Sequence, residues 1–198
     1  SGTGVLTALN TKTVYVRDLR GEITERLDSV GTKGFHHWYE YDSGGLLAKI
    51  YASTSATKPD TPAVTYTYRP SGEVASRQFA GGPVVPFHYT IRDQLEKIGD
   101  PESTSYPFSA KYSYHPNGTI SEAEFYNGGT PATAKRFKYT FGSSNYDALN
   151  RLKGAGYSYW SGASWVSTAA YGLTGITYDK SGNLMTLSRY GQNGALVD

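Results

Sequence analysis

Histidine is the first residue type in this sequence that could do chemistry, because imidazole binds metals and transfers protons near neutral pH. The chain contains His36, His37, His88 and His115. His36 and His37 are adjacent, so on a strand they would point to opposite faces and could not bind one ion together. There is no cysteine and no His-Glu-x-x-His spacing. We therefore interpret the histidines as surface or turn residues, and we predict no metal site.

Aspartate is the second candidate, because it recurs three residues before a glycine or asparagine, as Asp18, Asp42, Asp147 and Asp179. Such carboxylates could be general acids or calcium ligands, but the segment 179–183 lacks the later bidentate glutamate of a calcium loop. Closure of a turn by an Asx-type hydrogen bond explains every copy at once. The chain also lacks the glycine-rich and nucleophile motifs of common enzyme classes. We predict that the protein is not an enzyme and has no catalytic residue and no cofactor.

Tryptophan is the third candidate, because a flat aromatic face can stack on a sugar ring. Trp38, Trp160 and Trp165 are the three tryptophans, and all lie outside the repeat described below. The segment 157–165, YSYWSGASW, is typical of a hairpin with Ser-Gly-Ala-Ser at its tip. We retain these three residues as candidate ligand-stacking positions.

Most of the tyrosines follow a repeated frame of nine positions, which residues 112–120 (YSYHPNGTI) fit fully. The frame has an aromatic residue at positions one and three, four turn residues ending in glycine, and an aliphatic residue at position nine. Copies begin at residues 15, 39, 66, 89, 112, 144 and 176. The copy at 89 lacks the glycine, and the copy at 144 has Asn150 in its place.

Positions four to seven of the frame predict a turn that closes a β-hairpin. Aspartate at the first corner, proline at the second and glycine at the fourth are the preferences of a type I turn. The fourth corner needs the left-handed conformation, which glycine adopts freely and asparagine tolerates. The predicted structural turn residues are Gly21, Gly45, Gly72, Gly118, Asn150 and Gly182.

The turn geometry predicts that position three faces position nine and that position one faces position eleven. Tyrosines at positions one and three then share one face of the hairpin, and polar residues occupy the other. A single hairpin of this kind is marginally stable, so neighbouring hairpins must pair edge to edge. With 18 tyrosines, 23 glycines and no convincing helical periodicity, the chain is predicted to be all-β, with tandem hairpin repeats in a single curved or spiral antiparallel sheet.

The charge balance excludes several classes of partner. Nineteen basic and seventeen acidic residues give a net charge of +2, which is too small to indicate a nucleic acid or an anionic membrane. The absence of cysteine excludes a disulfide scaffold. No long apolar run is present, so membrane insertion is not expected.

Two stretches resemble a known family. Residues 146–157 (YDALNRLKGAGY) and 176–194 (ITYDKSGNLMTLSRYGQNG) are similar to the tyrosine–aspartate (YD) repeats of bacterial Rhs-type proteins, to which teneurin and toxin-complex cocoon repeats are related. The resemblance implies a spiral β-sheet that closes into a hollow shell, often around a toxic domain of the same polypeptide. A complete shell needs several times this many residues, so residues 1–198 are expected to be one repeat domain, a fragment of a larger protein. The family's self-cleavage motif has no counterpart here, so no catalytic aspartate is transferred.

The primary hypothesis is a noncatalytic segment of a YD-repeat β-shell that encloses or presents another polypeptide, within a polymorphic-toxin type of parent protein. The expected partners are the rest of that shell or an enclosed polypeptide, and self-association through sheet edges is also expected. The alternative is a carbohydrate-binding, adhesive module that binds glycan through the tryptophans. Either function predicts a secreted or cell-surface protein of a bacterium.

Overall fold

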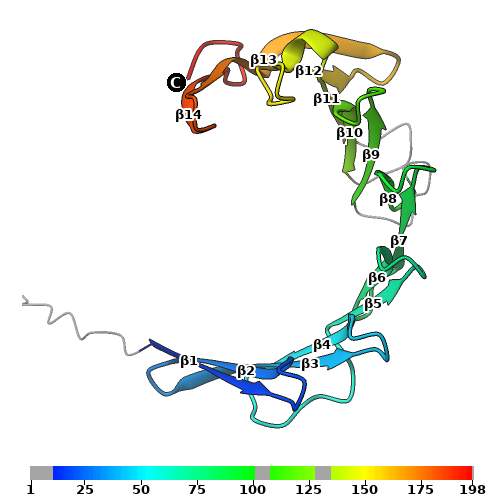
Figure 1. The fold of residues 1–198 in the computed structure, drawn as a ribbon, viewed down its shortest axis with the longest axis vertical. Coiled ribbons are helices and arrows are strands. Elements are labelled where there is room, and N and C mark those ends of the chain that lie inside the picture. Colours follow the sequence, from blue (N-terminus) through cyan, green and yellow to red (C-terminus); the bar gives the residue numbers. More distant parts are fainter. Residues whose placement is uncertain (1–10, 101–107, 128–134, 198) are drawn as a thin grey trace, which may run out of the picture. The chain divides into compact units, whose positions relative to one another are not determined.

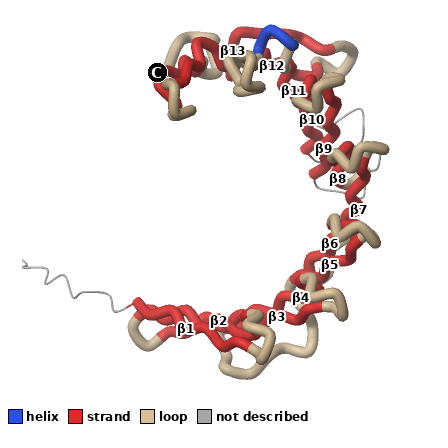
Figure 2. Tube along the Cα trace, viewed as in Figure 1, coloured by secondary structure: helices blue, strands red, loops and turns tan. Residues whose placement is uncertain are grey.

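The structure is a computed structural model that describes residues 11–100, 108–127 and 135–197. Fourteen strands of these residues form one antiparallel sheet, in which the order of the strands is their order along the chain. The only helix among them is the single 3-10 turn η1 (Ser143–Asn145). The predicted all-β fold of sequential hairpins is confirmed (Figures 1 and 2).

The chain divides into two compact units, Ser1–Val84 and Val85–Asp198, which we describe separately. The strands of the first unit are β1 (Thr11–Arg17), β2 (Ile23–Val30), β3 (Lys33–Tyr41), β4 (Leu47–Ser53), β5 (Val64–Tyr68) and β6 (Val74–Phe79). The strands of the second unit are β7 (Val84–Tyr89, whose first residue ends the first unit), β8 (Leu95–Ile98), β9 (Phe108–Tyr114), β10 (Ile120–Asn127), β11 (Lys135–Thr140), β12 (Ala155–Trp160), β13 (Trp165–Tyr178) and β14 (Leu184–Arg189).

In every copy except the one predicted to begin at Tyr89, the hairpin turn begins and ends where the frame predicts. Position three faces position nine in every predicted pair: Tyr41–Leu47, Tyr68–Val74, Tyr114–Ile120, Tyr146–Leu152 and Tyr178–Leu184. Each is an aromatic–aliphatic pair, which favours strand association. The Tyr146–Leu152 pair is an isolated bridge within the connection between β11 and β12, rather than part of two named strands.

Further from the turn, the predicted register is wrong by one residue. Position one faces position twelve, as in Tyr39–Ile50, Tyr66–Arg77 and Tyr112–Ala123. The cause is a β-bulge that leaves position ten without a cross-strand partner in each of these hairpins. The turn alone does not specify this extra residue, because a bulge adds a residue to one strand only.

The copy predicted to begin at Tyr89 begins two residues earlier, at Phe87. Tyr89 faces Leu95, and these residues therefore hold positions three and nine. Asp93 holds the turn position expected to be glycine and has a φ of 56°. Because aspartate also tolerates the left-handed region, the turn forms without glycine.

Strand alternation and the observed register give the sheet two different faces. The aromatic residues of positions one and three lie on what we call the tyrosine face, and the residues of position two lie on the opposite, polar face. Phe125 faces Phe137, which faces Tyr159, and all three extend the tyrosine face across β10, β11 and β12. On the polar face, Lys111 of β9, Glu124 of β10 and Lys138 of β11 are opposed in one row of alternating charge.

Few side chains are fully buried, because one sheet has no second layer of strands or helices over either face among the described residues. The buried apolar residues are mainly small, with Ala110, Ala123, Ala155 and Ala170 as examples. Aromatic rings therefore supply the lateral packing. In the second unit they form a row of ring contacts through Phe108, Phe125, Phe137, Tyr157 and Tyr171, with centroid separations of 5.1–6.2 Å.

Candidate functional site

The recurring aspartates close the turns. The Oδ1 atom of Asp42 accepts hydrogen bonds from the backbone N–H groups of Gly44 and Leu46, both at 2.9 Å. Asp18, Asp147 and Asp179 each accept the equivalent pair of bonds. In the copy that begins at Phe87, which has Thr90 in place of aspartate, the Thr90 hydroxyl oxygen accepts them instead, both at 3.2 Å. The carboxylates are thus occupied by the backbone, which explains their spacing without a catalytic role.

These bonds have an electrostatic consequence for two of the aspartates. For Asp147, the N–H of Arg151 is the main cause of a pKa below the usual value, and the Arg151 guanidinium adds to it at 2.7 Å. For Asp179, the side chain and backbone of Asn183 lower the pKa. Both carboxyl groups therefore stay ionised in the folded protein, as turn closure requires.

All six turn residues singled out in the sequence have a positive φ. The glycine values range from 81° at Gly45 to 97° at Gly72, and Asn150 has a φ of 59°. The N–H of each of these residues donates to the carbonyl oxygen at position four, as in Gly118 to His115 at 2.9 Å. The six turns share one backbone geometry reached with different side chains.

Five of the position-three tyrosines each link a hairpin to the one before it. In each case the tyrosine hydroxyl donates to the backbone carbonyl oxygen of the position-nine residue in the preceding hairpin, and we call this contact the interhairpin tyrosine bond. The first unit contains Tyr41 to Ile23 and Tyr68 to Leu47, at 2.9 and 2.6 Å. The second unit contains Tyr114 to Leu95, Tyr146 to Ile120 and Tyr178 to Leu152, at 2.5, 2.8 and 2.8 Å.

Sequence reasoning gave these tyrosines a packing role and missed the hydroxyl. The signal was available, because position three is tyrosine in six copies, whereas position one varies between tyrosine, phenylalanine, serine and isoleucine. Phenylalanine would pack equally well, so retention of the hydroxyl indicates a hydrogen bond.

Sequence reasoning also missed a further turn. Tyr190 faces Leu196, and Gly194 between them has a φ of 72°.

The adjacent His36 and His37 lie on opposite faces of β3. His36 lies 2.9 Å from a Glu25 oxygen through Nδ1 and stacks on Trp38, while His37 lies on the other face of β3 near Asp28. His115 holds the first turn corner as predicted, but its Nε2 lies 2.7 Å from the carbonyl oxygen of Phe141. This contact, together with an edge-to-face contact with Tyr146, makes His115 a further link between neighbouring segments.

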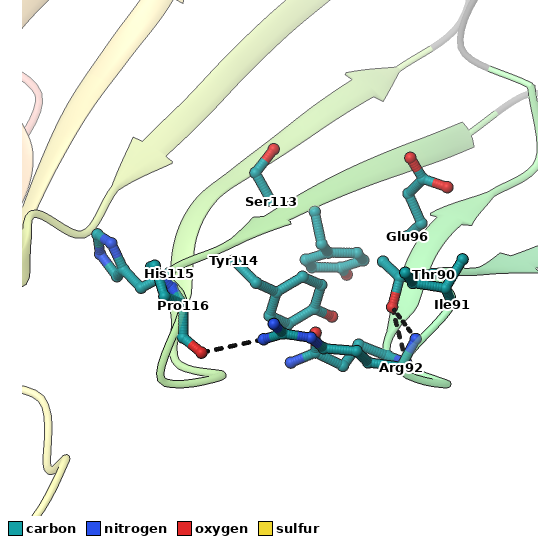
Figure 3. Close-up of a pocket in the computed structure, with 10 residues that line it drawn as sticks. Thr90, Ile91, Arg92, Glu96, Ser113, Tyr114, His115 and Pro116 are labelled. Carbon is teal, nitrogen blue, oxygen red and sulfur yellow. Dashed lines mark hydrogen bonds between the residues drawn. The ribbon is translucent and has the colours of Figure 1, made fainter.

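A shallow groove of about 400 Å³ lies between two successive turns of the second unit (Figure 3). The residues that line it come from two segments, 90–96 and 112–116, and the second segment includes Tyr114. Arg92 donates from Nη1 to the carbonyl oxygen of Pro116 at 3.0 Å across the groove, as Figure 3 shows. Gln94 donates to Gly118 in the same way at 3.2 Å. The groove is thus crossed by contacts that hold the two turns together.

Trp160 and Trp165 face one another at the tip of the β12–β13 hairpin, as the sequence indicated. Their rings are 5.5 Å apart and tilted by 70°. The guanidinium of Arg136 lies 4.8 and 5.6 Å from the two ring centres, and Lys138 lies 4.7 Å from Trp165. Each indole therefore already has a cation against it.

The same cluster continues on the polar face toward β10. Arg136 pairs with the buried Glu124 at 3.0 Å and also covers the ring of Tyr126. Burial, aided by the Glu124 carboxylate, raises the pKa of Tyr126 to about 12.

Trp38 belongs to the first unit and faces Tyr51 on the polar face of β3 and β4. Tyr51 is in turn covered by Lys58, which also bonds to Glu40.

The described residues contain no group of three or more histidine, aspartate or glutamate side chains arranged to hold a metal ion. No helix in the described part of the chain is long and apolar enough to cross a membrane.

Comparison with known proteins shows a likeness in fold. No family model and no curated protein matches the sequence. The crystal structure of TcdB2-TccC3 without its hypervariable C-terminal region matches 94% of this chain at 13% identity, with a TM-score of 0.51. The pore state of the Photorhabdus luminescens Tc holotoxin, with a mutation in TccC3, matches 93% at 12% identity and a TM-score of 0.49. This chain spans 13% of the length of each of those chains.

Proposed function

We propose that the protein is a noncatalytic structural segment of an Rhs-type YD-repeat β-shell, which encloses or presents another polypeptide. The observation that carries this proposal is the series of interhairpin tyrosine bonds. The recurring aspartates close the turns, and five of the position-three tyrosines connect one hairpin to the previous one. A sequence whose repeated residues close turns and connect neighbouring hairpins is suited to forming an extended sheet.

The likeness in fold to TcdB2-TccC3 supports the same proposal, because this chain corresponds to a small part of a much longer chain. The parent protein would be a toxin or effector that is secreted or held at the bacterial cell surface. Its remaining shell segments, or the polypeptide that they surround, would be the partners of this chain.

The tyrosine face is the surface that would meet the enclosed polypeptide. In the second unit its aromatic row has half-exposed rings, and Phe108 and Tyr171 are 45% and 43% exposed. The polar face carries charged residues that are paired with one another, such as Lys138 with Glu122 at 2.7 Å. An apolar face opposite a paired, charged face is the arrangement expected of a wall with two different environments.

Site-specific photo-crosslinking tests the proposal. A benzophenone amino acid replaces Phe137 on the tyrosine face in the protein produced by its natural host, and Lys111 on the polar face is the matched control. We expect the Phe137 position to crosslink to peptides outside residues 1–198, and the Lys111 position to do so much less. Equal yields at both positions, or crosslinks only within residues 1–198, would reject the assignment.

Glycan binding by the tryptophans remains the alternative, and the geometry gives it no separate support, because Arg136 and Lys138 already lie against the indole rings. A glycan array that shows binding, with its loss in Trp160→Ala or Trp165→Ala, would establish this function in place of a purely structural one.

A further inference from the structure

A hollow of about 370 Å³ lies in the second unit, where η1, the start of β12 and the middle of β13 come together. The residues that line it come from the segments 144–145, 153–156 and 173–175. Its volume falls within the range of about 300–1,000 Å³ that is usual for small-molecule sites. Because β12 and β13 are both inner strands of the sheet, the hollow involves no strand edge.

Small residues make up much of the lining, with Gly154, Ala155, Gly156 and Gly175 among them. A Cβ atom at Gly154 would lie 2.9 Å from the carbonyl oxygen of Leu173, which is closer than such atoms pack. The approach of the two backbones therefore requires glycine at this position and keeps larger side chains out of the hollow. The hollow is formed by the sheet itself, so a ligand would not have to open it.

Three polar side chains of the lining have no hydrogen-bond or ion-pair partner among the described residues: the Lys153 ammonium, the Asn145 amide and the Ser144 hydroxyl. Asn145 uses only its backbone, which accepts a hydrogen bond from the N–H of Lys153 at 2.7 Å. No lining residue is acidic. The hollow therefore offers one positive charge beside two neutral groups that can both donate and accept hydrogen bonds.

We propose that this hollow binds a small hydroxylated carboxylate, of the size of one sugar acid. The exposed Lys153 ammonium would pair with the carboxylate, and the single charges would balance. The Ser144 hydroxyl and the Asn145 amide would bond to ligand hydroxyls, and the glycines would let the ligand approach the backbone closely. A phosphate dianion fits less well, because the lining offers only one cation. The tryptophans take no part in this site.

An NMR titration of the ¹⁵N-labelled chain tests the proposal with galacturonate as the probe. Galactose, which has the same ring without the carboxylate, is the matched control ligand. We expect saturable shifts of the Gly154, Gly156 and Gly175 amides with galacturonate, and binding of galactose weaker by on the order of tenfold. Lys153→Gln should weaken galacturonate binding by a similar factor, and Lys153→Arg should retain most of it. Lys180→Gln, which removes an exposed charge from the next turn, should leave the affinity unchanged.

Shifts that do not saturate, or equal binding of the two sugars, would overturn the proposal. Binding that persists in Lys153→Gln, with unchanged far-ultraviolet circular dichroism, would overturn it as well. The trimer of galacturonate distinguishes the source of the ligand: tighter binding than that of the monomer indicates a polysaccharide, equal binding indicates a free acid, and both support the site. None of these outcomes depends on the proposed shell function, which the crosslinking at Phe137 tests separately.

Discussion

At the level of single residues, the fourth corner of each turn sets the path of the hairpin. Gly118 has a φ of 89°, and a Cβ placed there would meet only the Gln94 side chain at 3.5 Å, an ordinary contact. We expect Gly118→Val to lower the free energy of unfolding by about 1–3 kcal/mol, through backbone strain and not through a clash. Gly118→Asn should cost clearly less, because Asn150 adopts this conformation in an equivalent turn. Urea denaturation of both variants is the measurement, and equal losses would contradict a backbone origin.

His115 shows how a turn residue can acquire a second role. By position it replaces the usual aspartate, and the sequence alone suggests that His115→Asp is nearly neutral. In the structure its Nε2 contacts the Phe141 carbonyl oxygen at 2.7 Å, and an aspartate could not donate there. We therefore expect His115→Asp and His115→Ala to destabilise the fold by about 1 kcal/mol. His88→Ala, at an exposed position of β7, is the control and should have little effect on the thermal midpoint.

At the level of the hairpin, the interhairpin tyrosine bond can be removed while the ring is kept. Tyr146→Phe deletes the donor to the Ile120 carbonyl oxygen and should cost about 0.5–1.5 kcal/mol of unfolding free energy. Tyr112→Phe is the matched change at position one, where the hydroxyl makes no such bond to the described residues, and it should be close to neutral. A loss of the same size in both variants would assign the stability to ring packing instead.

Alkaline pH should weaken the same bonds. Burial raises the pKa values of Tyr41, Tyr68, Tyr114 and Tyr146 above the usual value of a tyrosine. Because the folded-state pKa exceeds that of the unfolded chain, their contribution is fully present below about pH 10 and is lost as the pH rises through the folded-state value. Urea midpoints measured from about pH 8 to pH 11 should fall over this range, alongside tyrosinate absorbance. Unchanged midpoints would contradict the assignment.

The hairpins also show where sequence reasoning works and where it stops. The turn and the pair beside it follow from local chemistry, so Tyr68–Val74 and Tyr178–Leu184 could be predicted. The bulge at position ten depends on how the two strands twist against each other, and no residue type marks it: Ala48, Glu96 and Ser121 all occupy it. The copy at Phe87 was misplaced because Thr90 and Asp93 replace the aspartate and glycine that define the frame.

At the level of the whole molecule, the two compact units should unfold with some independence. Trp38 reports on the first unit, and Trp160 and Trp165 report on the second. In repeat proteins a hairpin contacts mainly its neighbours, so damage remains local. We expect Gly45→Val, at a turn glycine with a φ of 81°, to lower the urea midpoint seen by Trp38 and to leave that seen by Trp160 and Trp165 nearly unchanged. Variants with Trp38→Phe or with both other tryptophans replaced separate the signals, and coincident shifts would contradict the prediction.

The candidate functional residues were only partly predictable, for a physical reason. Aspartate and glycine act within one turn, and their roles can be inferred from a nine-residue window. The Tyr41 hydroxyl instead reaches the carbonyl oxygen of Ile23, and Arg136 reaches Trp160 and Trp165 across two strands. Such partners are fixed by the pairing of separate hairpins, so they appear only when the register of the whole sheet is known.

The interhairpin tyrosine bond has a consequence for how the sequence of such a repeat protein can evolve. The hairpins that begin at Tyr39, Tyr112 and Ser144 each contain both a hydroxyl that donates to the preceding hairpin and a carbonyl oxygen that accepts from the following one. Duplication or deletion of one complete frame therefore leaves every remaining donor with an acceptor. A gene built in this way can lengthen or shorten by unequal recombination, without new compensating mutations at the joints.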